Sequence, residues 1–250
     1  MGKRWIPILV LVASLAAASA GIAVASPPKI IRESNLPIFL NGGFKPTRLP
    51  KKKLAPAHLT LAGSELHLGP APLKEAIFEI DKNVAFDTRG LAVCRPRPEF
   101  MTMPDFCKGT RVGKGEMEFE IEFPETPPFT EKSHVVAYNG GKPGGVRTIF
   151  VLGYLPNPVS AAVVTTVKVS KIHNGRYGTK LVTTIPPVAG SGSIKEFRLE
   201  LFRRFAYRHK KQSFLLARCA DGKLQAHWDA VFTDGTDAPG GFTRPCTPQP

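Results

Sequence analysis

Residues 115–123, GEMEFEIEF, alternate apolar and acidic side chains without interruption. Successive side chains of a β-strand point to opposite faces, so Met117, Phe119 and Ile121 share one face and the glutamates share the other. The segment 75–81, EAIFEID, repeats this period of two. A helix would mix the two sets around its circumference, because its period is 3.6 residues. The pattern therefore predicts strands with one buried and one solvated face.

The spacing of turn residues predicts the fold class. Gly occurs 23 times and Pro 24 times in 250 residues, which interrupts the chain too often for long helices. About eight to ten short strands separated by turns are typical of an antiparallel β-sandwich. We predict an all-β fold with a single domain over residues 59–250. Residues 197–207 also fit a helical stripe, and we predict a strand there that continues into the next hairpin as a three-strand meander.

A hairpin is predicted over residues 213–232, SFLLARCADGKLQAHWDAVF, because Asp221-Gly222 is typical of a type I′ turn. Folding about that pair places Cys219 opposite Leu224, on an apolar face that runs from Leu215 to Phe232, and Phe214 on the polar face. One slip in register would destroy the agreement between the two strands. Asn174-Gly175 is a second type I′ signal. Cys219 is therefore expected to point into the core.

Four cysteines are present, and an inward position among apolar residues disfavours a reactive thiol. The sequence has no CxxC motif, and no cysteine has a histidine three to five residues away, which disfavours zinc. An even number of cysteines in an exported chain favours disulfides. Four cysteines allow three pairings, of which we favour the two local ones, each contributing about 3 kcal/mol. The favoured pairs are Cys94–Cys107 and Cys219–Cys246.

The N-terminus has the organisation of a secretory signal peptide. Basic residues precede an apolar stretch, and a small-x-small site predicts cleavage between Ala25 and Ser26. The alternative is an uncleaved membrane anchor. With residues 1–25 as the signal peptide, the formal charge falls from +14 to +12, because Lys3 and Arg4 are removed. We expect a secreted or cell-wall-associated protein whose residues 26–58 form a Pro- and Lys-rich arm or linker.

The excess of Lys and Arg over Asp and Glu predicts the class of partner. An exported chain without aromatic interleaving or a known binding motif is not expected to bind nucleic acid. Anionic cell-wall polymer or lipid headgroups suit the compartment, and general solubility is the competing interpretation of the charge. The residues expected to meet an anionic surface are Lys51, Lys52, Lys53, Arg203, Arg204, Arg208, Lys210 and Lys211.

Several segments in a fixed order, among them FDTRGLAVC, YGTKLVTTIPPVAGSGSI, SFLLARCADG and the closing RPC, resemble a functionally uncharacterised family of secreted actinobacterial proteins. The resemblance covers about residues 73–246. It implies export, one compact domain and a framework of four cysteines, and it supplies no catalytic residues. Where relatives more often have Phe-Asn-Gly, this chain has Tyr138-Asn139-Gly140.

No catalytic, cofactor or metal motif is predicted. The six histidines are scattered singly, and the serines form no GxSxG element. The glutamates of 116–122 have two interpretations: an ion-paired outer face opposite Arg198 or Arg204, or paired carboxylates of a secreted hydrolase with Glu118 and Glu120. We expect a non-enzymatic extracellular or envelope-associated binding module. The hydrolase and a purely structural surface protein are the alternatives.

Overall fold

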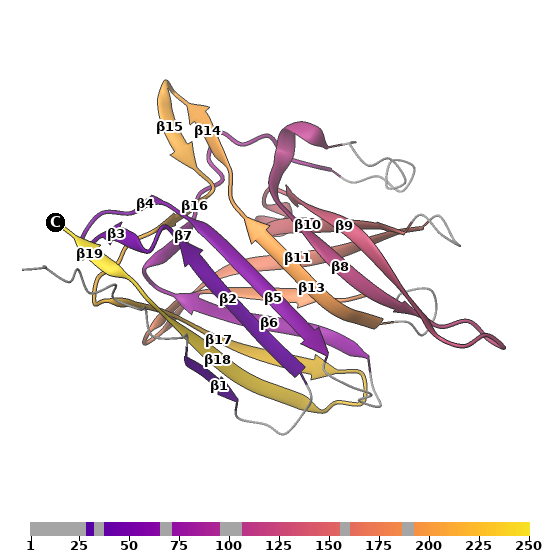
Figure 1. Ribbon diagram of the computed structural model, residues 1–250. Coiled ribbons are helices and arrows are strands. Elements are labelled where there is room, and N and C mark those ends of the chain that lie inside the picture. Colours follow the sequence, from indigo (N-terminus) through magenta and orange to yellow (C-terminus); the bar gives the residue numbers. More distant parts are fainter. Residues whose placement is uncertain (1–28, 33–37, 66–71, 96–106, 156–160, 187–192) are drawn as a thin grey trace, which may run out of the picture.

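The computed structural model describes residues 29–32, 38–65, 72–95, 107–155, 161–186 and 193–250 (Figure 1). Within these residues the regular elements are strands and two short 3₁₀ turns, η2 (Lys108–Thr110) and η3 (Pro143–Gly145). The main sheet has twelve antiparallel strands. In spatial order they are β1 (Lys29–Arg32), β18 (Asp237–Pro245), β17 (Lys223–Phe232), β6 (Leu73–Asp81), β12 (Tyr177–Thr184), β11 (Ala161–Asn174), β10 (Arg147–Leu155), β9 (Phe129–Asn139), β8 (Arg111–Ile121), β13 (Ser193–Leu201), β5 (His58–Glu65) and β2 (Ile38–Lys45).

This sheet curls until its two edges meet. Strands β2, β5, β13 and β8 form the front layer in Figure 1, with β6, β11 and β10 behind them. The layers join again where β2 lies against β18: a Cβ atom on Gly42 would lie 2.5 Å from the Phe242 ring. Arg244 also donates a hydrogen bond to the side-chain oxygen of Asn41. The predicted all-β antiparallel fold is confirmed, and its two layers belong to one continuous sheet.

Three small sheets complete the fold. They are β14 (Arg204–Tyr207) with β15 (Lys210–Ser213), the triplet β4 (Ala55–Pro56), β16 (Leu215–Ala217) and β7 (Val84–Phe86), and the parallel pair β19 (Thr247–Gln249) and β3 (Arg48–Pro50). Buried side chains of the triplet and of β3 join the main core, among them Leu49, Phe86 and Leu215. These small sheets cap one end of the curled sheet, which we call the capped end.

Both predicted disulfides are present. Cys94–Cys107 lies on the outer face of the main sheet, where Cys94 packs with Tyr138 and Leu152 in a second, smaller core. Cys219–Cys246 lies at the capped end, and Cys219 is fully buried. The amide of Cys219 donates to the carbonyl of Pro50 at 2.9 Å, so this disulfide joins the chain after β16 to the small parallel sheet.

The predicted faces of 213–232 are right but the predicted pairing is wrong. Leu215, Ala217, Cys219 and the inward residues of β17 are buried, as expected. Phe214, expected on the polar face, is fully buried as well. Strand β16 pairs with β7 and β4, and β17 pairs with β6 and β18. A type I′ turn needs positive φ at both central residues, and in Asp221-Gly222 only Gly222 has it, at 84°.

Two neighbouring predictions need similar correction. The strand predicted over residues 197–207 is divided: 197–201 belong to β13, the chain leaves the main sheet after Leu201, and β14 pairs only with β15. The ring of Phe202 stacks on His58 at this break, with 4.7 Å between ring centroids, so no three-strand meander forms. The second hairpin is present, but Asn174 pairs with Tyr177, so its central residues are Gly175 and Arg176 and only Gly175 has a positive φ, at 54°; the predicted type I′ turn at Asn174-Gly175 is wrong.

Residues 38–58 are not an arm. They form β2, β3, β4 and the start of β5, and Leu40, Phe44 and Leu49 are buried in the core. Gly42, inside β2, allows this strand to approach Phe242 closely. Residues 29–32 pair with β18. The expected signal peptide and its cleavage point at Ala25 and Ser26 lie outside the described residues.

The disulfide at the capped end is expected to carry a large share of the stability. Replacing both Cys219 and Cys246 by Ala releases a closed loop with a sequence separation of 27 residues. Chain entropy predicts that the free energy of unfolding falls by about 3–4 kcal/mol. Urea denaturation of the variant and the parent chain measures this difference. A loss below about 1 kcal/mol would contradict the structural role of this bridge.

Candidate functional site: the capped end

The antiparallel register brings seven segments of the chain to the capped end. Lys45 pairs with His58, Asn174 with Tyr177, and Lys223 with Pro245, so these chain reversals all lie at one end of the sheet. The other chain turns that lie next to these residue pairs in the sheet are at the same end. The segments are 45–58, 81–95, 107–112, 139–147, 171–177, 201–223 and 244–250.

Charge is divided very unequally between these segments and the rest of the chain. The seven segments contain 22 Lys and Arg residues and three Asp and Glu residues. The remainder of the sequence contains 12 Lys and Arg and 17 Asp and Glu residues. The positive charge of this protein therefore belongs to its capped end, and the rest is net acidic.

The three carboxylates of the capped end are all bonded to arginine. Asp81 is fully buried and accepts a hydrogen bond from Nε of Arg176 at 2.7 Å. It also accepts from the backbone amides of Asn83 and Gln225. Arg176 turns its other nitrogens to the carboxylate of Asp221 and to the carbonyl of Lys223. One guanidinium thus joins β6, the β11–β12 turn and the segment before β17.

The third carboxylate forms its own pair. Asp87 accepts from Nε and Nη2 of Arg89, the latter at 2.7 Å. The hydrogen bond from Arg89 lowers the pKa of Asp87, and the hydrogen bonds from Arg176 lower the pKa of Asp221. Both carboxylates stay ionised at neutral pH, and with Asp81 they provide three negative charges among the 22 cations of these segments. The other cations of the capped end therefore remain as a net excess.

The β14–β15 hairpin carries the densest group of these cations and projects from the rest of the fold (Figure 1). Its turn residues Arg208 and His209 have φ of 50° and 59°, a conformation that costs non-glycine residues about 1–2 kcal/mol each. The Arg208 guanidinium lies 5.3 Å from the centre of the Tyr207 ring. Tyr207 in turn packs on Gly90, where a Cβ atom would lie 2.1 Å from the ring. The contact between Tyr207 and Gly90 thus supports the strained turn, and the basic residues of the turn are exposed.

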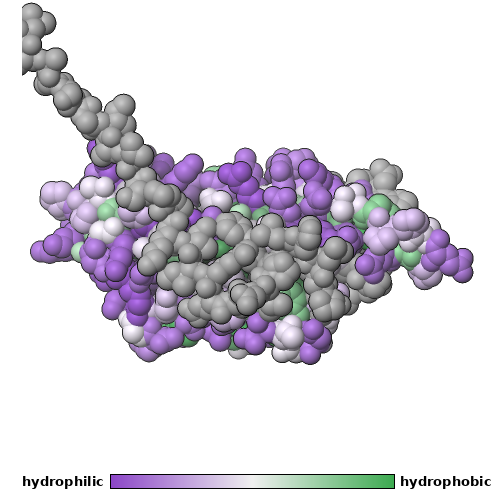
Figure 2. All heavy atoms as spheres, turned by 60° about the horizontal axis from the view of Figure 1, so that its bottom comes forward, coloured by the Kyte–Doolittle hydropathy of each residue, from purple (hydrophilic) through white to green (hydrophobic). Residues whose placement is uncertain are grey.

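The structure brings both groups of predicted surface residues to the same end. Arg204, Arg208, Lys210 and Lys211 are exposed on the hairpin, and Arg203 at its base is half-buried. Residues 51–53 are exposed in the chain between β3 and β4. The carbonyl of Lys52 accepts a hydrogen bond from Arg218, which follows β16. Figure 2 shows hydrophilic side chains at the left of the molecule and also along its top and at its right end.

The glutamate ladder of β8 lies elsewhere, on the outer face of the main sheet. Glu118 lies 3.5 Å from Lys132, Glu120 lies 2.8 Å from Lys195, and Glu116 lies 3.7 Å from His134. Arg198 is paired in register with Glu116 as expected, whereas Arg204 lies in the separate hairpin. Glu118 and Glu120 thus each have a lysine within 4 Å, which matches the ion-paired interpretation of this face.

The described residues contain no group of three or more His, Cys, Asp or Glu side chains placed to hold a metal ion. Nor do they contain an apolar helix long enough to cross a membrane. No family model matches the sequence, and neither a curated protein nor a solved structure shows significant similarity to it.

Sequence reasoning found the runs of cations but missed their isolated members at the capped end. Lys82, Arg218 and Lys223 are single cations in otherwise ordinary segments. Their common location follows from strand register, which the sequence did not settle. The signal that could have found them is the scarcity of carboxylates in every predicted chain reversal of this end.

The salt bridges of the capped end predict an acid-sensitive stability. The lowered pKa of Asp221 means that its contribution is complete above the ordinary aspartate pKa of about 3.9 and is lost as the pH falls below it. Asp221→Asn should therefore show a shallower fall in melting temperature between about pH 5 and pH 2 than the parent chain. Asp229→Asn, on β17 outside this end, is the control and should keep the steep fall. Identical pH profiles for Asp221→Asn and the parent would contradict this interpretation.

Proposed function

We propose that this chain is an extracellular, non-enzymatic binding protein that attaches through its capped end to a phosphate-bearing polymer of the cell envelope. The two disulfides support an oxidising compartment, as does the signal-peptide pattern of residues 1–25. The attachment is electrostatic and uses several weak contacts at once. The proposed surface consists of the β14–β15 hairpin, residues 51–53 and the neighbouring cations of the capped end.

One observation carries the proposal: the capped end holds 22 cations against three carboxylates, and arginine binds all three carboxylates. Uniform solubilising charge would be spread over the whole surface, with both signs mixed. Here the two signs are separated along the molecule, and a field of one sign attracts a polymer of the opposite sign. The planar guanidinium group of arginine also binds two oxygens of a phosphate group through two parallel hydrogen bonds.

A polymer fits this surface better than a lipid bilayer does. Insertion into a bilayer needs a cluster of large apolar side chains beside the cations. The exposed large apolar residues described at the capped end are Leu54, Val93 and Val146, each no more than 46% exposed. They belong to three different segments, whereas the cations occupy every segment. A projecting hairpin with a basic turn is suited to lie along a flexible chain of phosphates.

Charge reversal of the hairpin tests the proposal. The triple variant Arg208→Glu, Lys210→Glu, Lys211→Glu should bind purified cell wall at least about tenfold more weakly than the parent, because three contacts of up to about 1 kcal/mol each become repulsive. The matched control is Lys74→Glu, Lys168→Glu, Arg198→Glu, which makes the same charge change at exposed positions outside the capped end. The control should change binding by less than about twofold.

Three further experiments distinguish a phosphate polymer from other partners. Raising the salt concentration from 50 to 500 mM should release the parent chain, since exposed charges are screened beyond about 4 Å at that ionic strength. Cell wall stripped of its phosphate polymer should retain little protein. Equal losses in the two triple variants, salt-independent retention, or binding to anionic vesicles in preference to wall would each overturn the proposal.

A further inference from the structure

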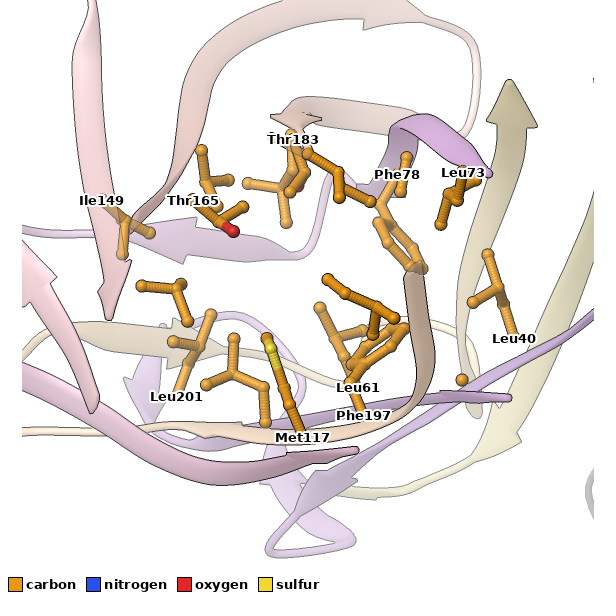
Figure 3. Close-up of a pocket in the computed structure, with 18 of the residues that line it drawn as sticks. Leu40, Leu61, Leu73, Phe78, Met117, Ile149, Thr165, Thr183, Phe197 and Leu201 are labelled. Atoms are coloured by element: carbon orange, nitrogen blue, oxygen red, sulfur yellow. The ribbon is translucent and has the colours of Figure 1, made fainter. Parts of the chain in front are cut away.

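The two layers of the curled sheet enclose a cavity between them. Figure 3 shows Ile149, Thr165, Thr183 and Phe78 on one wall, facing Leu201, Met117, Leu61 and Phe197 on the other. The space open to the centre of a water-sized sphere is about 80 Å³. One water molecule needs about 10–15 Å³ measured in this way. The core is therefore not filled by its own side chains.

The number of strands explains why the space remains. About eight strands enclose an interior that side chains can fill, and more strands enclose a wider one. This sheet has twelve strands. At the capped end the small sheets fill the interior with Leu49, Phe86 and Leu215. In the middle of the sheet the walls face each other directly, and the cavity lies between them.

A glycine sets the shape of one wall. A Cβ atom on Gly63 would lie 2.3 Å from Cδ2 of Leu40 and 2.4 Å from Cε1 of Phe197. Leu40 and Phe197 therefore lie flat across the backbone of β5 and leave the space above them open. Any larger residue at position 63 would displace these two side chains.

The chemistry of the walls excludes a polar occupant. The lining side chains are apolar apart from Lys195 and the hydroxyl-bearing Ser64, Thr165 and Thr183. Water in such a space finds few hydrogen-bond partners and is easily replaced by an apolar molecule. On β13 the lining residues run from Ile194 to Leu201, a distance of about 20 Å along an extended strand. About 80 Å³ of space for the centres of water-sized spheres, shared among the strands that line it, suits an occupant as narrow as one alkyl chain.

One charged residue lines the cavity, at the end remote from the capped end. The register of β13 against β8 shifts between Ile194 and Glu196, so Lys195 is a bulge residue. Both Ile194 and Lys195 line the cavity as a result. Its ammonium group lies 2.8 Å from Glu120 on the outer face of β8, so Lys195 extends from the cavity lining to the outside of the sheet and marks the mouth of the cavity. A lysine has three donors, so it can bind a second carboxylate while it keeps Glu120.

We propose that this cavity binds a single alkyl chain of a fatty-acid-like molecule, with the chain between the two layers and the carboxylate at Lys195. This site is separate from the capped end. A protein attached to an anionic polymer through the capped end would present the Lys195 end of the cavity away from that polymer. Binding of the alkyl chain needs no charge at the capped end, so each of the two proposals can be tested independently of the other.

The test uses the whole mature chain and a fluorescent probe, dansyl-labelled undecanoic acid. The parent chain should bind the probe with a micromolar dissociation constant, and dodecanoate should displace it. Val167→Phe places a ring in the cavity and should weaken probe binding at least tenfold. Val164→Phe, on the outer face of the same strand, is the matched control and should bind as the parent does. Ala76→Leu fills the same cavity by a smaller change and gives the readout if Val167→Phe does not fold.

The position of the carboxylate is tested with Lys195→Met. This variant should lower the affinity for dodecanoate at least threefold and leave the affinity for dodecanol unchanged. Equal effects on both ligands would overturn the assignment of the carboxylate to Lys195. Absence of probe binding, or equal binding by the parent and both filling variants, would overturn the alkyl-chain site itself. Neither result would affect salt-dependent attachment to the cell wall, which reports on the capped end alone.

Discussion

The buried carboxylate of Asp81 and its bonds to Arg176 hold the capped end together. Asp81 has no exposed surface, and it accepts hydrogen bonds from one guanidinium and two backbone amides. A buried charge that loses its partner destabilises a protein by about 3–5 kcal/mol, so neither member is free to change alone. Because Arg176 also holds Asp221, the loop that leads to Cys219 and the hairpin turn between β11 and β12 are fixed together.

The same network explains the charge of the surface outside it. The capped end uses its few carboxylates internally, to order its own loops around arginines. The cations on the β14–β15 hairpin and at residues 51–53 serve no comparable internal pairing in the described structure. Stability and the proposed attachment thus involve different basic residues, which is why charge reversal on the hairpin is expected to weaken attachment without unfolding the protein.

The sequence predicted local features well and partner strands poorly. Alternation in 75–81 and 115–123 located β6 and β8 and their buried faces, because each face depends on its own strand alone. The cysteine pairs were accessible because both are close in sequence. The hairpin at Asp221-Gly222 failed because β16 finds better partners in β7 and β4, which are distant in sequence. The arm predicted over residues 26–58 failed for the same reason, since β2 is held by contacts with Phe242, which is distant in sequence.

The candidate sites show the same difference between local features, which the sequence predicted, and long-range contacts, which it did not. The basic runs were visible in the sequence, but their gathering with single cations such as Lys82 and Arg218 needed the register of the whole sheet. The cavity was invisible, because each of its walls looks like an ordinary apolar strand face. Only the number of strands and the curl of the sheet show that the two walls do not fill the space between them.

The central claim is that one end of this molecule, and not its surface as a whole, meets an anionic polymer. Amide chemical-shift mapping by NMR, during titration with a phosphate-bearing polymer fragment, tests it most directly. The account predicts that the shifted amides cluster in residues 203–211 and 51–53 and that those of β8 and β9 stay in place. Shifts spread over the whole surface, or concentrated away from the capped end, would contradict it.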